Sequence, residues 1–191
     1  MKVRVAILAS GSGTNAENIV NYFKNSSTVE IAMIASNKPG AYVLERAKKL
    51  GVPYYHFTNE ELKEGMVANQ LILKRIDFIV LAGFLQKIPS GLIQVFPNRI
   101  INIHPALLPN YGGKGMYGDK VHQVVIENSD KESGISIHYV NENYDEGAII
   151  FQAKCEVSEN DTPSSLAKKI HELEYLHFPK VIEETILKIN A

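Results

Sequence analysis

Asn102 and His104 stand two residues apart near the end of an isoleucine-rich run at 100–103. β-Branched residues favour a strand buried on both faces, and alternate side chains of a strand point to the same side. Pro105 has no N–H to donate and therefore ends the strand. The pair is expected to project from the end of a buried strand, where ligands of open α/β sheets bind. An amide and an imidazole there can donate hydrogen bonds to a ligand, or they can satisfy only the local backbone.

A glycine-rich turn, Ser-Gly-Ser-Gly-Thr-Asn at 10–15, follows the first apolar run of the chain. A helix is expected after it at 16–23, so free N–H groups of the turn lie at a helix N-terminus, where the helix dipole favours an anion. We interpret the turn as a cradle for a single phosphate group. The looser dinucleotide fingerprint also fits, but the second strand at 29–35 lacks the terminal carboxylate that would bind ribose hydroxyls. A tight turn without a ligand is the remaining interpretation.

The elements that position these residues alternate regularly between strand and helix as far as His104. This alternation requires a parallel sheet with right-handed crossover connections. The loop after the fourth strand carries Phe84, Leu85 and Ile88, which can pack in the core or line the side of a flat ligand. Expected strands lie at 3–9, 29–35, 52–57, 77–82 and 100–104, and expected helices at 16–23, 41–50, 58–75 and 90–95.

The second part of the chain has a different pattern, which predicts partly antiparallel strands. The final helix is expected to begin with Thr162 as N-cap and Pro163 as its first residue. Pro179 is expected to kink or break it before a second piece at 180–189. The predicted fold class is α/β: a Rossmann-like, mostly parallel mixed sheet with helices on both faces and antiparallel C-terminal strands. The other expected elements are a glycine-rich loop at 112–118, a helix at 119–127 and strands at 133–140 and 148–157.

Bulk composition narrows the class of protein. The chain of 191 residues has the length of one domain and can bury roughly 70% of its unfolded surface. Its net charge of −1 gives no broad field for nucleic acid or an anionic membrane, so neither is an expected partner. The single cysteine, Cys155, excludes an internal disulfide and is typical of a reducing cytosol. The first apolar run is too short for a signal peptide or a membrane span.

Two motifs together resemble the formyltransferase family that uses 10-formyltetrahydrofolate. They are Asn-x-His-Pro-x-Leu-Leu-Pro at 102–109 and Asp-Glu-Gly at 145–147. The resemblance runs from the first strand to the final helix and implies one formyltransferase domain over 1–191. In that domain, 1–104 is a parallel half that binds phosphate, and 105–191 is a folate-side half with the C-terminal helix. Within the family, the turn at 10–15 is similar to that of members that formylate phosphoribosylglycinamide in purine synthesis.

The resemblance implies a reaction without a metal and without a covalent enzyme intermediate. The substrate amine attacks the formyl carbon of the co-substrate 10-formyltetrahydrofolate, and negative charge develops on the formyl oxygen. Asn102 and His104 would donate hydrogen bonds to this oxyanion, each worth about 3–4 kcal/mol. Asp145 would lie near His104, raise the pKa of His104 and relay the amine proton through water to the leaving folate nitrogen. A turn-forming carboxylate is the ordinary explanation of Asp145 alone.

The resemblance also implies binding residues for both substrates. Glu174 would bind ribose hydroxyls, although a solvated helix face explains its segment nearly as well. His138 matches a histidine near the family's site, and a hydrogen-bonded strand histidine explains it equally. The implied phosphoribosylglycinamide contacts are Gly13, Thr14, Asn15, His171, Glu172, Leu173 and Glu174. The implied folate contacts are Leu85, Gln86, Lys87, Ile88, Asn102, Asn141, Glu142, Asn143, Tyr144 and Asp145.

Two segments depart from the family's pattern. Residues 59–63 lack an arginine expected to reach the folate or phosphate, and the loop at 113–118 differs from the commoner version. Lys114 in that loop could supply the missing positive charge, or it could simply be solvated. These departures concern the folate tail and the loop, and not the reaction centre.

The sequence leaves several functions to be distinguished. A formyltransferase acting on another amine, such as an amino sugar nucleotide, would have the same reaction centre. A nicotinamide-dependent oxidoreductase would rest on the first turn alone, and a non-catalytic phosphosugar-binding module would not need the Asn102, His104 and Asp145 set. We expect a cytoplasmic monomer or homodimer whose partners are small-molecule substrates.

Overall fold

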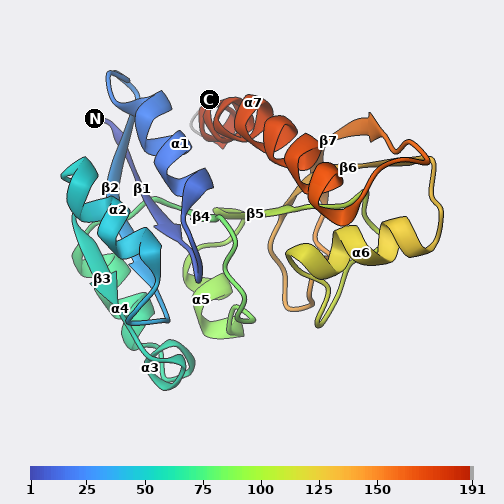
Figure 1. The fold of residues 1–191 in the computed structure, drawn as a ribbon. Coiled ribbons are helices and arrows are strands. Elements are labelled where there is room, and N and C mark those ends of the chain that lie inside the picture. The colour runs from blue at the N-terminus through green and yellow to red at the C-terminus, as the bar shows by residue number, and fades with distance from the viewer. Residues whose placement is uncertain (190–191) are drawn as a thin grey trace.

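A mixed sheet of seven strands runs through the computed structural model, which describes residues 1–189 (Figure 1). Its strands are β1 (Val3–Leu8), β2 (Val29–Ser36), β3 (Tyr54–His56), β4 (Phe78–Leu81), β5 (Ile100–His104), β6 (Glu132–Tyr139) and β7 (Ile149–Glu156). Their order across the sheet is β3-β2-β1-β4-β5-β6-β7. The first five pair in parallel, whereas β6 is antiparallel to β5 and β7 is antiparallel to β6. The predicted, mostly parallel sheet with antiparallel C-terminal strands is confirmed.

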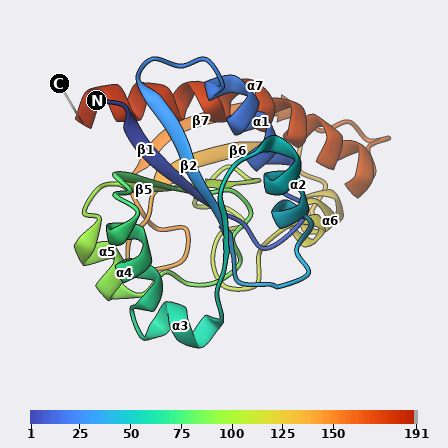
Figure 2. The ribbon, with the colours of Figure 1, turned by 90° about the vertical axis from the view of Figure 1, so that its left-hand side faces the viewer.

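Helices cover both faces of this sheet, as Figure 2 shows. They are α1 (Thr14–Phe23), α2 (Tyr42–Leu50), α3 (Asn59–Lys63), α4 (Met66–Leu73), α5 (Ser90–Val95), α6 (Asp119–Glu127) and α7 (Pro163–Ile189). Alternate side chains of β1 divide between the faces: Val5 and Ile7 pack with residues of α1, α2, α6 and α7, and Leu8 packs with residues of α3, α4 and α5. No helix within residues 1–189 combines the length and apolar character needed to span a membrane.

The segment between β3 and β4 differs from the single helix expected at 58–75. Thr58 forms a capping box: its hydroxyl accepts from the Glu61 N–H, and the Glu61 carboxylate accepts from the Thr58 N–H. The helix nevertheless ends early, because Gly65 adopts φ 83°, a left-handed conformation that interrupts a helix. The prediction of one helix is therefore wrong. The strand before it is also shorter than expected, because Pro53 has no N–H to donate to the ladder.

α7 continues through Pro179, so the expected break at this residue is wrong. Proline lacks the N–H that would bond to the carbonyl four residues earlier, which belongs to Tyr175. In the structure the side-chain amide of Asn18 on α1 donates to that carbonyl at 3.0 Å. The neighbouring helix thus satisfies the group that proline leaves free. The helix begins as predicted, with the Thr162 hydroxyl accepting from the Ser165 N–H at 3.2 Å.

We predict that Asn18→Ala destabilises the fold relative to Asn21→Ala. Both substitutions remove an asparagine from α1 and gain the same helix propensity, but only Asn18 donates to the free carbonyl of Tyr175. The difference in the free energy of unfolding should be about 0.5–1.5 kcal/mol, the net value of one hydrogen bond. Urea denaturation of both variants measures it. Equal stabilities would show that solvent replaces Asn18 at no cost.

Candidate active site

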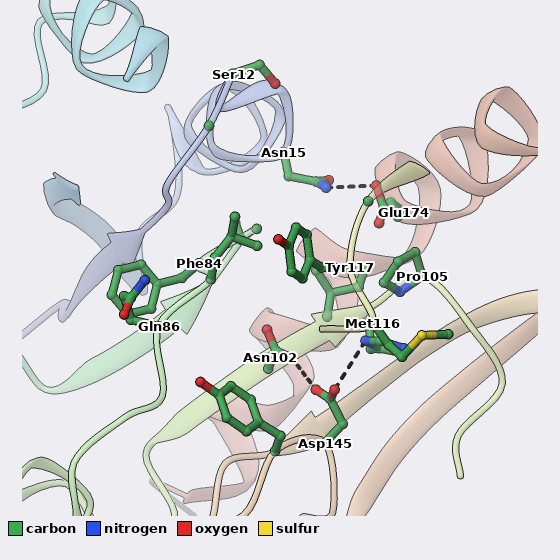
Figure 3. A pocket seen from close by; sticks show the side chains of 18 of the residues that line it. Ser12, Asn15, Phe84, Gln86, Asn102, Pro105, Met116, Tyr117, Asp145 and Glu174 are labelled. Atoms are coloured by element: carbon green, nitrogen blue, oxygen red, sulfur yellow. Dashed lines mark hydrogen bonds and ion pairs between the residues drawn. The ribbon is translucent and has the colours of Figure 1, made fainter. Parts of the chain in front are cut away.

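A cavity of about 610 Å³ lies at the carboxyl ends of β1, β4 and β5, the edge where open α/β sheets bind ligands (Figure 3). The N-terminal half contributes the glycine-rich turn, the loop after β4 and the end of β5. The later half contributes the 113–118 loop, Tyr144, Asp145 and residues of α6 and α7. Figure 3 shows an Asn15–Glu174 pair and an Asn102–Asp145 pair in different parts of the cavity, with Tyr117 between them.

The Asn102 amide is oriented by a histidine on the neighbouring strand. Asn102 on β5 lies opposite His138 on β6 in the antiparallel register. His138 Nδ1 is 2.8 Å from the carbonyl of Tyr139, so this nitrogen carries the hydrogen and donates it. His138 Nε2 is therefore an acceptor, and the Asn102 Nδ2–H group donates to it at 3.1 Å. His138 is a hydrogen-bonded strand histidine that also touches the site.

Asp145 brings a carboxylate to both residues from a loop more than forty positions later. Its Oδ1 lies 3.4 Å from Asn102 Nδ2, and its Oδ2 lies 3.6 Å from His104 Nδ1. The Gly113 N–H donates to Oδ2 at 3.0 Å, which ties this loop to the glycine-rich 112–118 segment. Burial opposes ionisation of Asp145, but the two nearby histidines, His138 with its Nε2 3.6 Å from Oδ1 and then His104, together with the Gly113 N–H, outweigh it and lower the pKa of Asp145. The amide, imidazole and carboxylate thus lie together in one cavity.

Burial and Asp145 act in opposite directions on the pKa of His104. Its side chain is only 4% exposed, and this burial lowers the pKa of His104 below its ordinary value. Asp145 acts in the predicted direction and raises the pKa, but it does not offset the desolvation. The predicted effect of Asp145 on His104 is thus present in direction, and burial sets the net shift. These shifts favour a neutral His104 beside an ionised Asp145.

The glycine-rich turn is held in place by α2. Gly13 has φ 77°, and a Cβ at this position would overlap the Val43 side chain. The Val43 N–H donates to the Gly11 carbonyl at 3.1 Å, and Arg46 Nε donates to the Ser12 carbonyl at 2.9 Å. These contacts leave the N-terminus of α1 facing the cavity, where it can bind an anion.

Asn15 and Glu174 join the turn to the last helix. The Asn15 amide donates to Glu174 Oε2 at 2.8 Å, while its Oδ1 is buried and has no hydrogen-bond partner among residues 1–189. Glu174 is itself buried, and this burial raises its pKa. His171 lies one helical turn earlier and also lines the cavity, whereas Glu172 and Leu173 do not. Of the four α7 residues expected to touch substrate, two therefore reach the cavity.

All but one of the residues expected to contact folate line either the main cavity or a smaller pocket beside it. The Leu85 N–H donates to the Ser10 hydroxyl at 3.0 Å, which fixes the loop after β4 against the end of β1. Glu142 lines neither space. Leu85, Gln86, Asn102, Tyr144 and Asp145 line the main cavity. Lys87, Ile88, Asn141 and Asn143 line a side pocket of about 50 Å³ that shares Phe84, Gln86, Asn102, Tyr144 and Asp145 with the cavity.

Sequence reasoning gave no role to His122 on α6. Its side chain is buried and lines the cavity, and its Nδ1 has no hydrogen-bond partner among the described residues. Burial, followed by the neighbouring His171, lowers the pKa of His122. Val121 and Val125 share the buried face of α6 with it. A histidine within an apolar helical stripe was therefore the sequence signal that could have indicated a buried polar side chain here.

The loop at 113–118 also lines the cavity, through Lys114, Met116 and Tyr117 among others. Lys114 therefore brings a positive side chain to the cavity, whereas none of residues 59–63, where the arginine was expected, lines it. Within the part of the chain that the structure describes, no three His, Cys, Asp or Glu side chains gather in a way that could hold a metal ion.

Comparisons with known proteins point to one family. The formyl transferase family model matches residues 3–182. A chloroplastic phosphoribosylglycinamide formyltransferase of Arabidopsis thaliana is 39% identical over 94% of this chain, which spans only 64% of that protein. The phosphoribosylglycinamide formyltransferase of Bacillus subtilis is 35% identical over 96% of this chain and 94% of its own. The crystal structure of the Bacillus halodurans phosphoribosylglycinamide formyltransferase matches with TM-score 0.86 and 38% identity, over 95% of this chain and 94% of that one.

The two glycines of the turn provide a matched pair of substitutions. We predict that Gly13→Ala destabilises the protein by about 1–3 kcal/mol, because its backbone is left-handed and its Cβ would overlap Val43. A Cβ at Gly11 would meet nothing within 4 Å, so Gly11→Ala should change stability by less than about 0.5 kcal/mol. Thermal and urea denaturation compare the two. A tolerated Gly13→Ala would show that α2 does not hold the turn.

Proposed function

Because the chain belongs to the formyl transferase family, we propose that it transfers the formyl group of 10-formyltetrahydrofolate to the amine of N1-(5-phospho-D-ribosyl)glycinamide. One observation carries the proposal. Asn102, His104 and Asp145 meet in a cavity that also holds a glycine-rich turn at a helix N-terminus. The cavity thus combines groups for acyl transfer with a cradle for a phosphate, as this pair of substrates requires. We place this reaction of de novo purine synthesis in the cytosol.

Asn102 and His104 supply the stabilisation of the oxyanion. As the amine attacks the formyl carbon, negative charge develops on the formyl oxygen, and hydrogen-bond donors aimed at this charge lower the barrier. The Asn102–Asp145 hydrogen bond is long at 3.4 Å, so this amide hydrogen is available to a nearby oxygen. His104 becomes a charged donor once it gains a proton. By analogy with the oxyanion holes of other enzymes, each donor lowers the activation free energy by about 3–4 kcal/mol.

The proton balance follows from the two shifted pKa values. Burial lowers the pKa of His104, so the ring enters the reaction neutral. The developing oxyanion adds a negative charge beside the ring and favours the imidazolium, so Nδ1 takes up a proton from water and returns it when the oxyanion collapses. Asp145 stays ionised, so it can accept the proton that the attacking amine loses. Delivery of this proton through water to the leaving folate nitrogen completes the transfer.

The two ends of the cavity suit the two substrates. The phosphate lies against Gly13, Thr14 and Asn15, where N–H groups at the start of α1 favour an anion. The unpartnered Asn15 Oδ1 and the Glu174 carboxyl provide acceptors for hydroxyl groups of the ribose. The pterin lies between the loop at 84–88 and Tyr144, where apolar side chains cover its flat faces.

The alternatives have weaker support. β2 ends at Ser36, and the next residue, Asn37, accepts a hydrogen bond from the Ser10 hydroxyl at 2.7 Å. No carboxylate stands there to bind the ribose of a nicotinamide cofactor. A phosphosugar-binding module would leave the Asp145 contacts without a purpose. A different amine acceptor keeps the same reaction centre and is the alternative that an assay must decide.

An acceptor panel tests the substrate. The protein is incubated with 10-formyltetrahydrofolate and either phosphoribosylglycinamide, glycinamide without the phosphoribosyl group, or an amino sugar nucleotide, and release of tetrahydrofolate is followed. We predict turnover with phosphoribosylglycinamide and at least about a hundredfold lower kcat/KM for free glycinamide, because the phosphate and ribose contacts are lost. Turnover with the amino sugar nucleotide alone would overturn the proposed acceptor. Saturable NADPH binding without formyl transfer would favour the oxidoreductase.

Asp145→Asn tests the reaction centre. We predict that kcat falls by at least about a hundredfold, because an amide cannot accept the proton of the amine. The fold should remain, since the amide oxygen can still accept from the Gly113 N–H. Glu146→Gln is the control, because it changes the neighbouring exposed carboxylate and retains an oxygen that can accept from Asn143. Near-normal turnover of Asp145→Asn would remove Asp145 from the mechanism.

A further inference from the structure

The His104 ring has a second hydrogen bond, on the side away from Asp145. Its Nε2 lies 2.7 Å from the carbonyl oxygen of Tyr111. A carbonyl only accepts hydrogen bonds, so Nε2 carries a hydrogen in both the neutral ring and the imidazolium. Nδ1 is then the nitrogen that gains or loses a proton, and it is the one that lies 3.6 Å from Asp145 Oδ2.

The Tyr111 carbonyl is held in place by its own side chain. Tyr111 has φ 57°, a left-handed conformation that costs free energy for a residue with a Cβ. Its hydroxyl donates to Asp130 Oδ2 at 2.6 Å and accepts from Asn128 Nδ2 at 2.8 Å. Both partners lie between α6 and β6, and the ring packs against the main core. The phenol therefore fixes a strained backbone against the rigid part of the fold.

We propose that Tyr111 is a positioning residue that, through its phenol, fixes the tautomer and orientation of His104. The inference rests on the proposed formyl transfer and deepens it. With Nε2–H engaged by Tyr111, the hydrogen on Nδ1 is the only one His104 can offer to the formyl oxygen. That hydrogen is present only in the imidazolium, so the ring must gain a proton at Nδ1, beside Asp145, to stabilise the oxyanion. If the carbonyl moved away, Nε2 could lose its hydrogen, and the neutral ring could adopt the other tautomer.

The chain offers a matched set of variants. Tyr111→Phe removes both phenol hydrogen bonds, and Asp130→Ala removes one of them from the other side. Asp130→Asn keeps an oxygen that can accept from the phenol, so it should restore the behaviour of the unmodified protein. Tyr22→Phe is the control, because the exposed Tyr22 donates its hydroxyl hydrogen to Glu183 at 2.8 Å. This variant also loses a hydrogen bond from a phenol to a carboxylate, but between α1 and α7 and away from His104.

The decisive measurement is the tautomer of His104. Nitrogen-15 NMR of histidine-labelled protein distinguishes protonated from unprotonated ring nitrogens, and a His104→Asn sample identifies the His104 signals. We expect the Nε2–H form in the unmodified protein, in Tyr22→Phe and in Asp130→Asn. We expect a mixture of tautomers in Tyr111→Phe and Asp130→Ala, together with a lower pKa of His104, because the carbonyl contact raises this pKa.

Kinetics provide the second measurement. For Tyr111→Phe and Asp130→Ala, kcat should fall by about 3- to 10-fold with little change in either KM, since binding surfaces are unaltered and only the ring is misplaced. An unchanged His104 tautomer in a folded Tyr111→Phe would overturn the proposal, whatever the loss of activity. If Tyr111→Phe does not fold, Asp130→Ala decides by the same criterion. The NMR result needs no turnover, so it stands even if the proposed acceptor fails.

Discussion

The contact of Asp145 with His104 depends on the register between β5 and β6. In that register Asn102 faces His138, and the turn after β6 returns Asp145 to the end of β5. A slip by one residue would send His138 to the opposite face of the sheet and remove the acceptor that orients the Asn102 amide. The turn itself admits little variation, because a Cβ at Gly147 would overlap the carbonyl of the last residue of β6. The antiparallel strands therefore serve to deliver a carboxylate.

Burial by itself lowers the pKa of His104 and raises the pKa of Asp145. Desolvation disfavours the charged form of either group, and it prevails at His104 but not at Asp145. Asp145 remains ionised because the Gly113 N–H and the Asn102 amide donate to its carboxylate. His104 has only the Tyr111 carbonyl and the Asp145 carboxylate to favour its charged form. Neighbouring groups with pKa values pushed in this way hold different protonation states at one pH. The cavity therefore pairs an ionised acceptor with an imidazole that can take up a proton.

The sequence predicted what depends on local pattern and failed where distant groups decide. The mostly parallel sheet with its antiparallel last strands, the placement of Asn102 and His104 at the end of β5, and the Thr162 cap of α7 follow from periodicity and residue type. The continuation of α7 through Pro179 does not, because its compensating donor, Asn18, lies on another helix. The net shift of the His104 pKa was likewise open at the level of sequence, because it depends on the extent of burial, which residue spacing does not report. Gly65, by contrast, is visible in the sequence as a possible break between two helices, but the helical pattern on both sides of it favoured a single helix.

Residues of both halves of the chain, 1–104 and 105–191, build each end of the cavity. Asn15 belongs to the glycine-rich turn, yet its partner Glu174 lies on the last helix. The loop at 84–88 belongs to the first half, yet it shares its pocket with residues of the 141–145 turn. The packing of α7 against α1 therefore closes the end of the cavity beside the glycine-rich turn (Figure 1). A change that loosens α7 would move Glu174 relative to Asn15 while leaving β5 intact, so under the proposed function it would weaken binding of the acceptor before it disturbed Asn102 and His104.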